Sequence, residues 1–172
     1  MSTAFTVVRN FERKGFKFLG CGYYAAVFES NVDPNLVYKI GRTLSDPFLE
    51  YAANNTLKQN PHYPRIYDLY TDIDNDWYLV KMEALTPLPK HKYSFATKVS
   101  SFAREEITDT DISLEMNQLI DEIKRMSKLD DSVNLDLHSG NIMMRGVTPV
   151  ITDPLAEYYL ETDLDMEQWY EG

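Results

Sequence analysis

The feature that most constrains the fold is a polar loop followed by two short apolar runs. Asp136 and Asn141 lie in the loop, and Asp153 follows the second run. The runs, residues 142–144 and 150–152, predict a two-stranded antiparallel ribbon. A short loop and a ribbon of this kind would bring the three polar side chains into one cleft.

Two carboxylates and an amide at this spacing are typical of a phosphoryl-transfer site. In protein kinases an Asp accepts the proton of the attacking hydroxyl, and an Asn about five residues later binds magnesium. A further Asp, at the end of a strand, bridges metal and phosphates. Asp136, Asn141 and Asp153 stand in these three places. The pattern D-x-x-x-x-N is weak by itself, so the interpretation needs a second motif.

A glycine turn between two apolar segments is that second motif. Gly20 and Gly22 would let backbone N–H groups approach the phosphates of a nucleotide. Farther along the chain, Lys39 interrupts the apolar run 36–40. A Lys is costly to bury without an anionic partner, and the phosphates of ATP would be that partner. Glycine turn, strand lysine, loop and strand-end Asp occur in kinase order, which is far more specific than any one of them.

On these residues the chain resembles the protein-kinase-like superfamily, from about Gly15 to Pro154. Within it, L-D-L-H-S-G-N-I-M-M and P-V-I-T-D-P are similar to the early serine/threonine protein kinases of short-tailed bacteriophages. The resemblance implies an α+β, minimal bilobal protein-kinase-like fold in a single domain, residues 1–172. An antiparallel β-sheet N-lobe with the hinge would occupy about residues 1–86, and a truncated helical C-lobe about residues 87–172.

The resemblance also implies roles for individual residues. Asp136 would be the catalytic base, Lys39 would contact the α- and β-phosphates, and His138 would reach the γ-phosphate as a donor. Asn141 and Asp153 would bind Mg²⁺. The residues expected to bind ATP are Gly20, Gly22, Ala25, Val27, Lys39, Glu50, Met82, Glu83 and Leu85.

Two of these assignments have alternatives that the sequence leaves open. Glu50 would either pair with Lys39 or be one of several exposed helix acids, because helix phase cannot be fixed from one sequence. Met82 would border the adenine pocket, with backbone groups of residues 83–85 bonded to the adenine edge. The alternative for this segment is an ordinary sheet edge that leaves for a loop.

The chain departs from the kinase pattern in three places. Ala25 replaces the third glycine of the nucleotide loop. His138 stands where protein kinases usually have Lys, as in small-molecule phosphotransferases with a D-L-H-x-G-N loop. Asp153 is followed by Pro-Leu instead of Phe-Gly, and too few residues remain for an ordinary activation segment. Two rivals therefore stay open: an aminoglycoside-like phosphotransferase, and a non-catalytic kinase-like module that binds and inhibits a host protein.

Periodicity and turn residues predict the remaining elements, and Pro87 and Pro89 mark the lobe boundary. An acidic face on a terminal helix is expected at residues 157–171, with a docking tail as the alternative. The predicted strands are residues 16–19, 26–30, 36–40, 64–69 and 77–82, and the predicted helices are residues 46–59, 94–106 and 111–129.

Composition bounds the partners and the compartment. The 172 residues are 44% hydrophobic and carry a net charge of −10, so basic protein surfaces are better partners than nucleic acid. The single Cys excludes an internal disulfide, and neither a signal peptide nor an apolar run of ~18 residues is present. The chain is expected in the cytoplasm, without membrane contact. The resemblance implies host proteins as phosphorylation substrates, in the host cytoplasm, with transcription or RNA-processing machinery among them.

Overall fold

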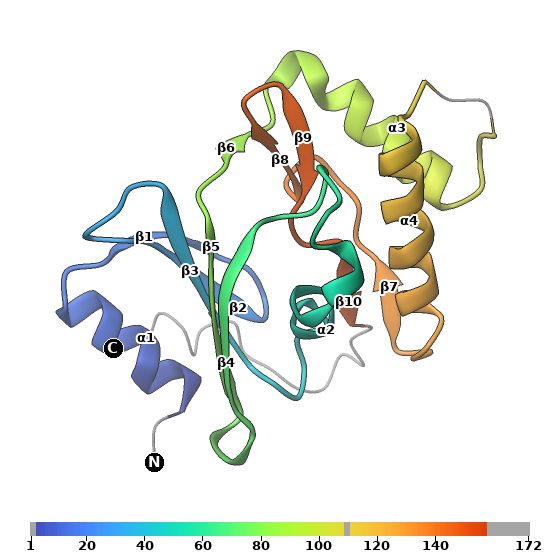
Figure 1. The fold of residues 1–172 in the computed structure, drawn as a ribbon. Coiled ribbons are helices and arrows are strands. Elements are labelled where there is room, and N and C mark those ends of the chain that lie inside the picture. The colour runs from blue at the N-terminus through green and yellow to red at the C-terminus, as the bar shows by residue number, and fades with distance from the viewer. Residues whose placement is uncertain (1–2, 109–110, 158–172) are drawn as a thin grey trace.

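The computed structural model describes residues 3–108 and 111–157, and the first half of the chain is an antiparallel sheet (Figure 1). Its strands pair in the order β1-β2-β3-β5-β4. The α+β fold with an antiparallel N-terminal sheet is confirmed, and each strand lies within a few residues of its predicted place. The strands are β1 (Lys17–Cys21), β2 (Ala25–Glu29), β3 (Leu36–Gly41), β4 (Ile66–Asp72) and β5 (Trp77–Glu83).

β3 is the central strand of this sheet and carries Lys39. In the register, Lys39 lies between Val27 of β2 and Val80 of β5. In the turn before β3, the Asp33 carboxylate accepts the Asn35 N–H at 2.9 Å. A strand that is hydrogen-bonded on both edges holds its backbone firmly, so the point from which Lys39 projects is fixed.

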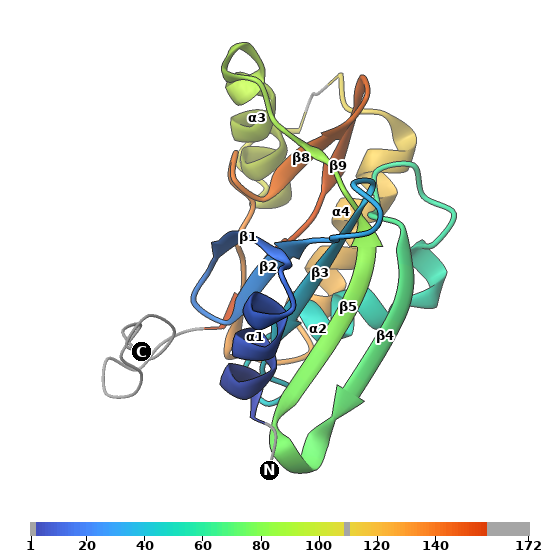
Figure 2. The same cartoon turned by 90° about the vertical axis from the view of Figure 1, so that its left-hand side faces the viewer.

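A helix that the sequence analysis did not predict, α1 (Ala4–Arg13), lies along the sheet (Figure 2). Thr3 caps it, because the Thr3 hydroxyl accepts the Thr6 N–H at 3.4 Å. Val8 of α1 forms a small apolar cluster with buried residues of β2 and β3. The helix therefore covers the face of the sheet opposite α2 (Figure 1).

α2 (Phe48–Ala53) is shorter than the helix predicted at residues 46–59. At its start, the Asp46 carboxylate accepts the N–H of Phe48, the first helical residue, at 3.0 Å. It ends early because the Asn54 side chain accepts a backbone N–H two residues later, at 3.0 Å. That bond starts a separate 3₁₀ turn, Asn55–Leu57, so the predicted length is wrong.

The second half of the chain, as far as the structure describes it, contains helices and a β-ribbon (Figure 1). The predicted ribbon forms, with Gly146 at its turn at φ +61°. β7 and β10 pair with each other and were not predicted, because three residues are too few for a periodic pattern. The elements here are β6 (Thr86–Pro87), α3 (Tyr93–Ala103), α4 (Leu114–Ser127), β7 (Val133–Leu135), β8 (Ile142–Arg145), β9 (Thr148–Ile151) and β10 (Leu155–Glu157), and the remaining 3₁₀ turns are Ile73–Asn75 and Lys90–Lys92.

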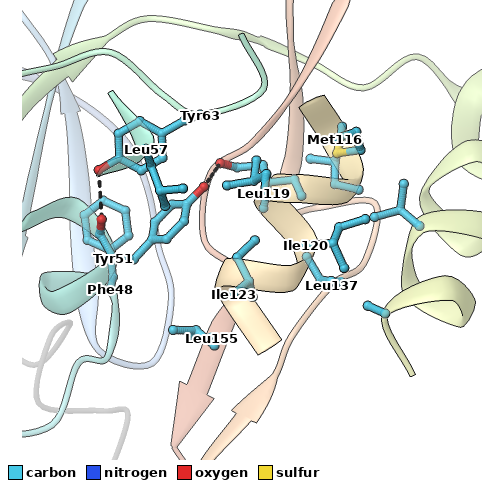
Figure 3. Close-up of a cluster of buried hydrophobic side chains, with 14 of the residues drawn as sticks. Phe48, Tyr51, Leu57, Tyr63, Met116, Leu119, Ile120, Ile123, Leu137 and Leu155 are labelled. Carbon is cyan, nitrogen blue, oxygen red and sulfur yellow. Dashed lines mark hydrogen bonds between the residues drawn. The ribbon is translucent and has the colours of Figure 1, made fainter. Parts of the chain in front are cut away.

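One apolar core joins the two halves (Figure 3). The cluster contains Phe48 and Tyr51 of α2, Ile120 and Ile123 of α4, and Ile151 of β9. The Tyr51 hydroxyl also donates to the Ile151 carbonyl at 2.9 Å. The position of β9 is therefore fixed relative to the first half of the chain.

Two expectations concern parts of the chain beyond this core. The predicted terminal helix at residues 157–171 lies, except for its first residue, outside the described residues. Within residues 3–108 and 111–157, no helix combines the length and apolar character that a membrane span requires.

A single carboxylate fixes the end of the β4–β5 turn. Asp76 has a left-handed backbone, with φ 52°. Its side chain accepts hydrogen bonds from Leu44 N–H at 2.9 Å, Thr43 Oγ1 at 3.0 Å and Arg42 Nε at 2.7 Å. Burial raises the pKa of Asp76, but these bonds and the Arg42 charge outweigh burial and lower the pKa below its usual value.

We expect Asp76→Asn to lower the free energy of unfolding by about 1–3 kcal/mol at neutral pH, because hydrogen bonds to a charged acceptor contribute on this order. Asn also adopts the left-handed conformation readily. Since the folded pKa is depressed, the contribution is present above the unfolded pKa and is lost as pH falls through the folded pKa. Urea unfolding of the two proteins should therefore converge in acid. A difference that persists there would contradict the role of the charge.

Candidate active site

A cleft of about 710 Å³ lies between the sheet and the loop–ribbon segment, and residues of both halves line it. Its lining includes every residue predicted for ATP, magnesium and catalysis except Glu50. Glu50 is exposed on α2 and does not line the cleft. The predicted residues that the structure brings together are Gly20, Gly22, Ala25, Val27, Lys39, Met82, Glu83, Leu85, Asp136, His138, Asn141 and Asp153.

The loop before β8 holds Asp136 and Asn141 against each other. Asn141 Nδ2 donates to the Asp136 carbonyl at 2.8 Å and to Asp136 Oδ2 at 2.9 Å. The Asp136 N–H donates to the Pro154 carbonyl at 2.7 Å, which ties the loop to the segment after β9. The carboxylate is thus held through Oδ2, while 43% of its side chain is exposed. A carboxylate fixed in this way can accept a proton from a bound hydroxyl.

His138 lies beside this carboxylate in a defined tautomer. The Gly140 N–H donates to His138 Nδ1 at 3.0 Å, so Nδ1 carries no proton and the neutral ring is protonated on Nε2. Nε2 lies 3.6 Å from Asp136 Oδ1. A Cβ added at residue 140 would lie 2.7 Å from the His138 ring, so a larger residue there would displace the ring from this position. His138 is therefore a hydrogen-bond donor at the catalytic end of the cleft.

Asp153 follows β9 and meets Lys39, whose Nζ donates to Asp153 Oδ2 at 2.8 Å. The other oxygen, Oδ1, is covered and accepts no hydrogen bond from the described residues. The side chain borders the cleft with 38% exposure, yet the protein around it desolvates the carboxyl group. This burial raises the pKa of Asp153, the charges of Asp46 and Asp136 raise it further, and Lys39 lowers it. A cation at Oδ1 would satisfy this oxygen.

The oxygen ligands here fit a magnesium ion that is shared with phosphates. Within the described ranges, no three Asp, Glu, His or Cys side chains are placed to hold a metal by themselves. Mg²⁺ is usually bound by one or two protein carboxylates together with substrate phosphates and water. Asp153 Oδ1 has no hydrogen-bond partner among the described residues but is covered, so the side chain would have to turn toward the cleft to bind the ion. The bonds of Asn141 to Asp136 use its amide nitrogen and leave the amide oxygen available.

Lys39 is buried, with 6% of its surface exposed, and has two partners besides Asp153. Asp46 Oδ2 lies 3.7 Å from Nζ, and the centre of the Phe48 ring lies 3.6 Å from it. The acid that approaches Lys39 from the α2 segment is therefore Asp46, at the start of the helix. Glu50 lies farther along α2, where it is exposed, so the structure does not bring it to Lys39.

In the glycine turn, neither packing nor backbone conformation requires glycine at residues 20 and 22. A Cβ added at Gly20 or Gly22 would meet nothing within 4 Å, and neither residue has a positive φ. A ligand that approaches the backbone closely is a physical reason for glycine at such positions. One expectation needs correction, because the Gly22 N–H donates to the Ala25 carbonyl at 2.9 Å and is not directed at phosphates.

The hinge after β5 uses most of its own backbone donors. The Glu83 N–H donates to the Arg65 carbonyl at 3.1 Å, and the Ala84 N–H donates to the Asn35 carbonyl at 2.8 Å. These two groups are therefore unavailable for the adenine edge. Of the predicted hinge donors, the Leu85 N–H remains, with no acceptor among the described residues.

The Glu83 side chain is held in a buried ion pair. Arg145, at the end of β8, donates to the Glu83 carboxylate through Nε at 2.8 Å and also through Nη2. Arg145 donates further to the carbonyls of Pro61 at 2.8 Å and Tyr63 at 3.0 Å. The Glu83 carboxylate raises the pKa of Arg145. This pair fixes the hinge relative to the ribbon that follows Asn141 and precedes Asp153.

Sequence reasoning missed the contributions of Asp46, Phe48 and Arg145. One usable signal was Asp46 itself, an acid placed shortly after Lys39 in the chain and at the start of the predicted helix. Arg145 gave a second signal, because it is a lone cation that follows a short apolar strand. Neither signal identifies the partner, which lies 62 residues away for Arg145.

We expect Arg145→Met to lower the free energy of unfolding by about 3–5 kcal/mol, because Glu83 would stay buried without its cation. Adding Glu83→Gln should recover part of this loss, since the uncompensated charge is then gone. The matched control is Arg125→Met, which removes an exposed pair with Glu122 and should cost about 0–1 kcal/mol. Denaturant unfolding of the unmutated protein and of these three variants gives the four free energies of unfolding. Equal losses for the two Arg variants would contradict the buried pair's role.

Comparison with known proteins finds similarity to a sequence family and to solved structures. A chain of the CAK complex of Chaetomium thermophilum bound to ATP-γ-S shares 14% identity at a TM-score of 0.43. The match covers 94% of this chain but 54% of that one, so this chain spans about half the length of that protein. A search of curated proteins gave no match. The profile of the family described as bacteriophage T7 protein kinase 0.7 matches residues 3–168. The chain therefore belongs to the bacteriophage T7 protein kinase 0.7 family.

Proposed function

We propose that this protein is an ATP-dependent serine/threonine protein kinase. One observation carries the proposal: Lys39, Asp136, Asn141 and Asp153, from both halves of the chain, line a single cleft. These are the groups that phosphoryl transfer requires for positioning and for charge stabilisation. Family membership supports the same conclusion. The reaction moves the γ-phosphoryl group of ATP to a Ser or Thr hydroxyl and leaves ADP.

At the acceptor end, Asp136 orients the hydroxyl and accepts its proton as the oxygen attacks phosphorus. Asn141 keeps this carboxylate in place through the 2.9 Å bond to Oδ2. His138 presents its Nε2–H beside Asp136 and donates to the phosphoryl group being transferred. Most of the rate comes from positioning and electrostatics, because the protein forms no bond to the phosphoryl group.

At the nucleotide end, Lys39 binds the α- and β-phosphates. The apolar side chains of Val27, Met82 and Leu85 line the part of the cleft that receives adenine. Mg²⁺, bound by Asn141 and Asp153, would neutralise charge on the phosphates. The Leu85 N–H is the backbone donor for the adenine edge.

The proposed acceptors are proteins of the bacterial host, in the host cytoplasm, with transcription and RNA-processing proteins among them. The net charge of −10 supports acceptors with basic surfaces. The same charge disfavours direct binding to nucleic acid.

A second candidate function is transfer to a small hydroxylated molecule such as an aminoglycoside. The observation that favours it is the loop around His138, whose sequence matches the D-L-H-x-G-N loop of such enzymes. The same residues would perform the phosphoryl transfer, so the acceptor alone separates the two candidates.

We expect Asp136→Asn to reduce phosphoryl transfer at least about 100-fold, because the proton acceptor is lost. Nucleotide binding should stay within a few-fold, since Asp136 makes no contact with Lys39. The assay uses γ-labelled ATP and Mg²⁺, with a bacterial lysate, a basic model protein and a panel of aminoglycosides as acceptors. The matched control is Asp131→Asn, at an exposed position in the turn before β7.

Each outcome of this assay has a defined meaning. Transfer retained by Asp136→Asn would exclude Asp136 as the base. Label on aminoglycosides instead of proteins would favour the second candidate. Magnesium-dependent binding of ATP without transfer to any acceptor would indicate a non-catalytic module that acts by binding a host protein.

A further inference from the structure

Two carboxylates lie close to the Lys39 ammonium group, and they differ in whether they are also placed to bind a metal ion. Asp153 is nearer, at 2.8 Å from Nζ, but it is also the carboxylate best placed to bind magnesium. Asp46 is 3.7 Å away and does not line the cleft. When Asp153 turns to a metal ion, Asp46 is the described carboxylate that still faces the ammonium group.

Both oxygens of Asp46 are fixed by the protein. Oδ1 accepts the Phe48 N–H at 3.0 Å, which also caps α2. Oδ2 accepts a short hydrogen bond from the Tyr78 hydroxyl. The side chain is 2% exposed, so water does not compete for either oxygen. These two hydrogen bonds fix the position from which Oδ2 faces Lys39.

The Tyr78 hydroxyl reaches Asp46 because of its neighbour across the strands. Tyr78 of β5 pairs with Gly41 of β3 and is completely buried. A Cβ at Gly41 would lie 2.5 Å from the Tyr78 ring, so only glycine leaves room for the ring there. Burial and the nearby Asp46 charge raise the pKa of Tyr78 well above its usual value, so the hydroxyl stays a proton donor.

From this geometry we infer that Asp46, oriented by the Tyr78 hydroxyl, is the positioning residue that keeps the Lys39 ammonium group on the nucleotide phosphates. Gly41 makes the arrangement sterically possible. The inference rests on the proposed function, because it concerns the same nucleotide site. It transfers to Asp46 the pairing role that sequence reasoning offered to Glu50.

The direction in which nucleotide affinity changes when the Asp46 charge is removed distinguishes two explanations. If Asp46 only repelled the bound phosphates, removing its charge would relieve that repulsion and tighten nucleotide binding. A positioning role predicts the opposite, because Lys39 would then stay with Asp153 and compete with the metal. Asp46→Asn keeps an oxygen for the Phe48 N–H at the start of α2. It replaces Oδ2, which faces Tyr78 and Lys39, by an uncharged amide nitrogen, so it removes the charge and the acceptor of the Tyr78 hydroxyl together.

The experiment is calorimetric titration of the full chain with β,γ-imido-ATP over a series of Mg²⁺ concentrations. Asp46→Asn and Tyr78→Phe should each weaken binding, about tenfold for Asp46→Asn, and should raise the Mg²⁺ concentration needed. The controls are Glu50→Gln and Tyr63→Phe, which should leave binding unchanged. Tyr63 is a fair match for Tyr78, because its buried hydroxyl donates to the Tyr51 and Ala52 carbonyls, away from Lys39.

A double-mutant cycle separates positioning from general damage to the fold. In a Lys39→Met background, Asp46→Asn should cause no further loss of affinity, because its effect passes through Lys39. If Asp46→Asn lowered the affinity by the same factor in the Lys39→Met background as in the unmutated chain, its role would be structural and the inference would be overturned. Unchanged or tighter binding by folded Asp46→Asn, or weakening by Glu50→Gln, would also overturn it.

Two further readouts keep the test decisive. If thermal denaturation shows that Asp46→Asn does not fold, Tyr78→Phe in both backgrounds decides in the same way. If the unmutated chain binds no magnesium nucleotide, the proposed function and this inference both fail. If the unmutated chain binds but the Asp46 and Tyr78 variants bind equally well, only this inference fails.

Discussion

The arrangement around the site depends on one buried ammonium group. Lys39 projects from the central strand of the sheet, and a charge in that position is tolerated only with anionic partners close by. Its partners come from two other places, Asp46 before α2 and Asp153 after β9. The ion pairs therefore bring the start of a helix and the end of the ribbon to the sheet. The same contacts define the wall of the cleft where phosphates would bind.

Two further contacts fix the position of the β8–β9 ribbon relative to the first half of the chain. The Glu83–Arg145 pair joins the hinge to the end of β8, and the Tyr51 hydroxyl joins α2 to β9. Both links end on the β8–β9 ribbon, which lies in the chain between the two residues that would bind magnesium. Polar side chains that must be positioned to a fraction of an ångström are best supported by rigid elements with packed neighbours. The continuous apolar core beneath them provides that support.

Much of the site could be predicted because its signals are local. The loop of Asp136 and Asn141 and the ribbon before Asp153 are read from spacing, and Lys39 stands out as a charge in an apolar strand. The partners of these residues could not be predicted, since they depend on how distant segments pack. Of the two alternatives left open for Glu50, the structure agrees with the exposed helix acid, and the acid that approaches Lys39 is Asp46, before the helix. The pair β7 and β10 was missed for a related reason, since short strands are defined by each other and not by their own sequence.

The charges at the cleft explain why nucleotide and metal should bind together. Among the described residues that line it, Lys39 is the sole Lys or Arg. Asp136 and Asp153 line the same space, and Asp46 lies behind Lys39. A triphosphate would add further negative charge where negative charge already exceeds positive. One ammonium group cannot balance it, whereas a divalent cation at Asp153 offsets both the carboxylate and the phosphates. Burial raises the pKa of Asp153, and the charges of Asp46 and Asp136 raise it further. The same excess of negative charge would make nucleotide affinity depend on magnesium.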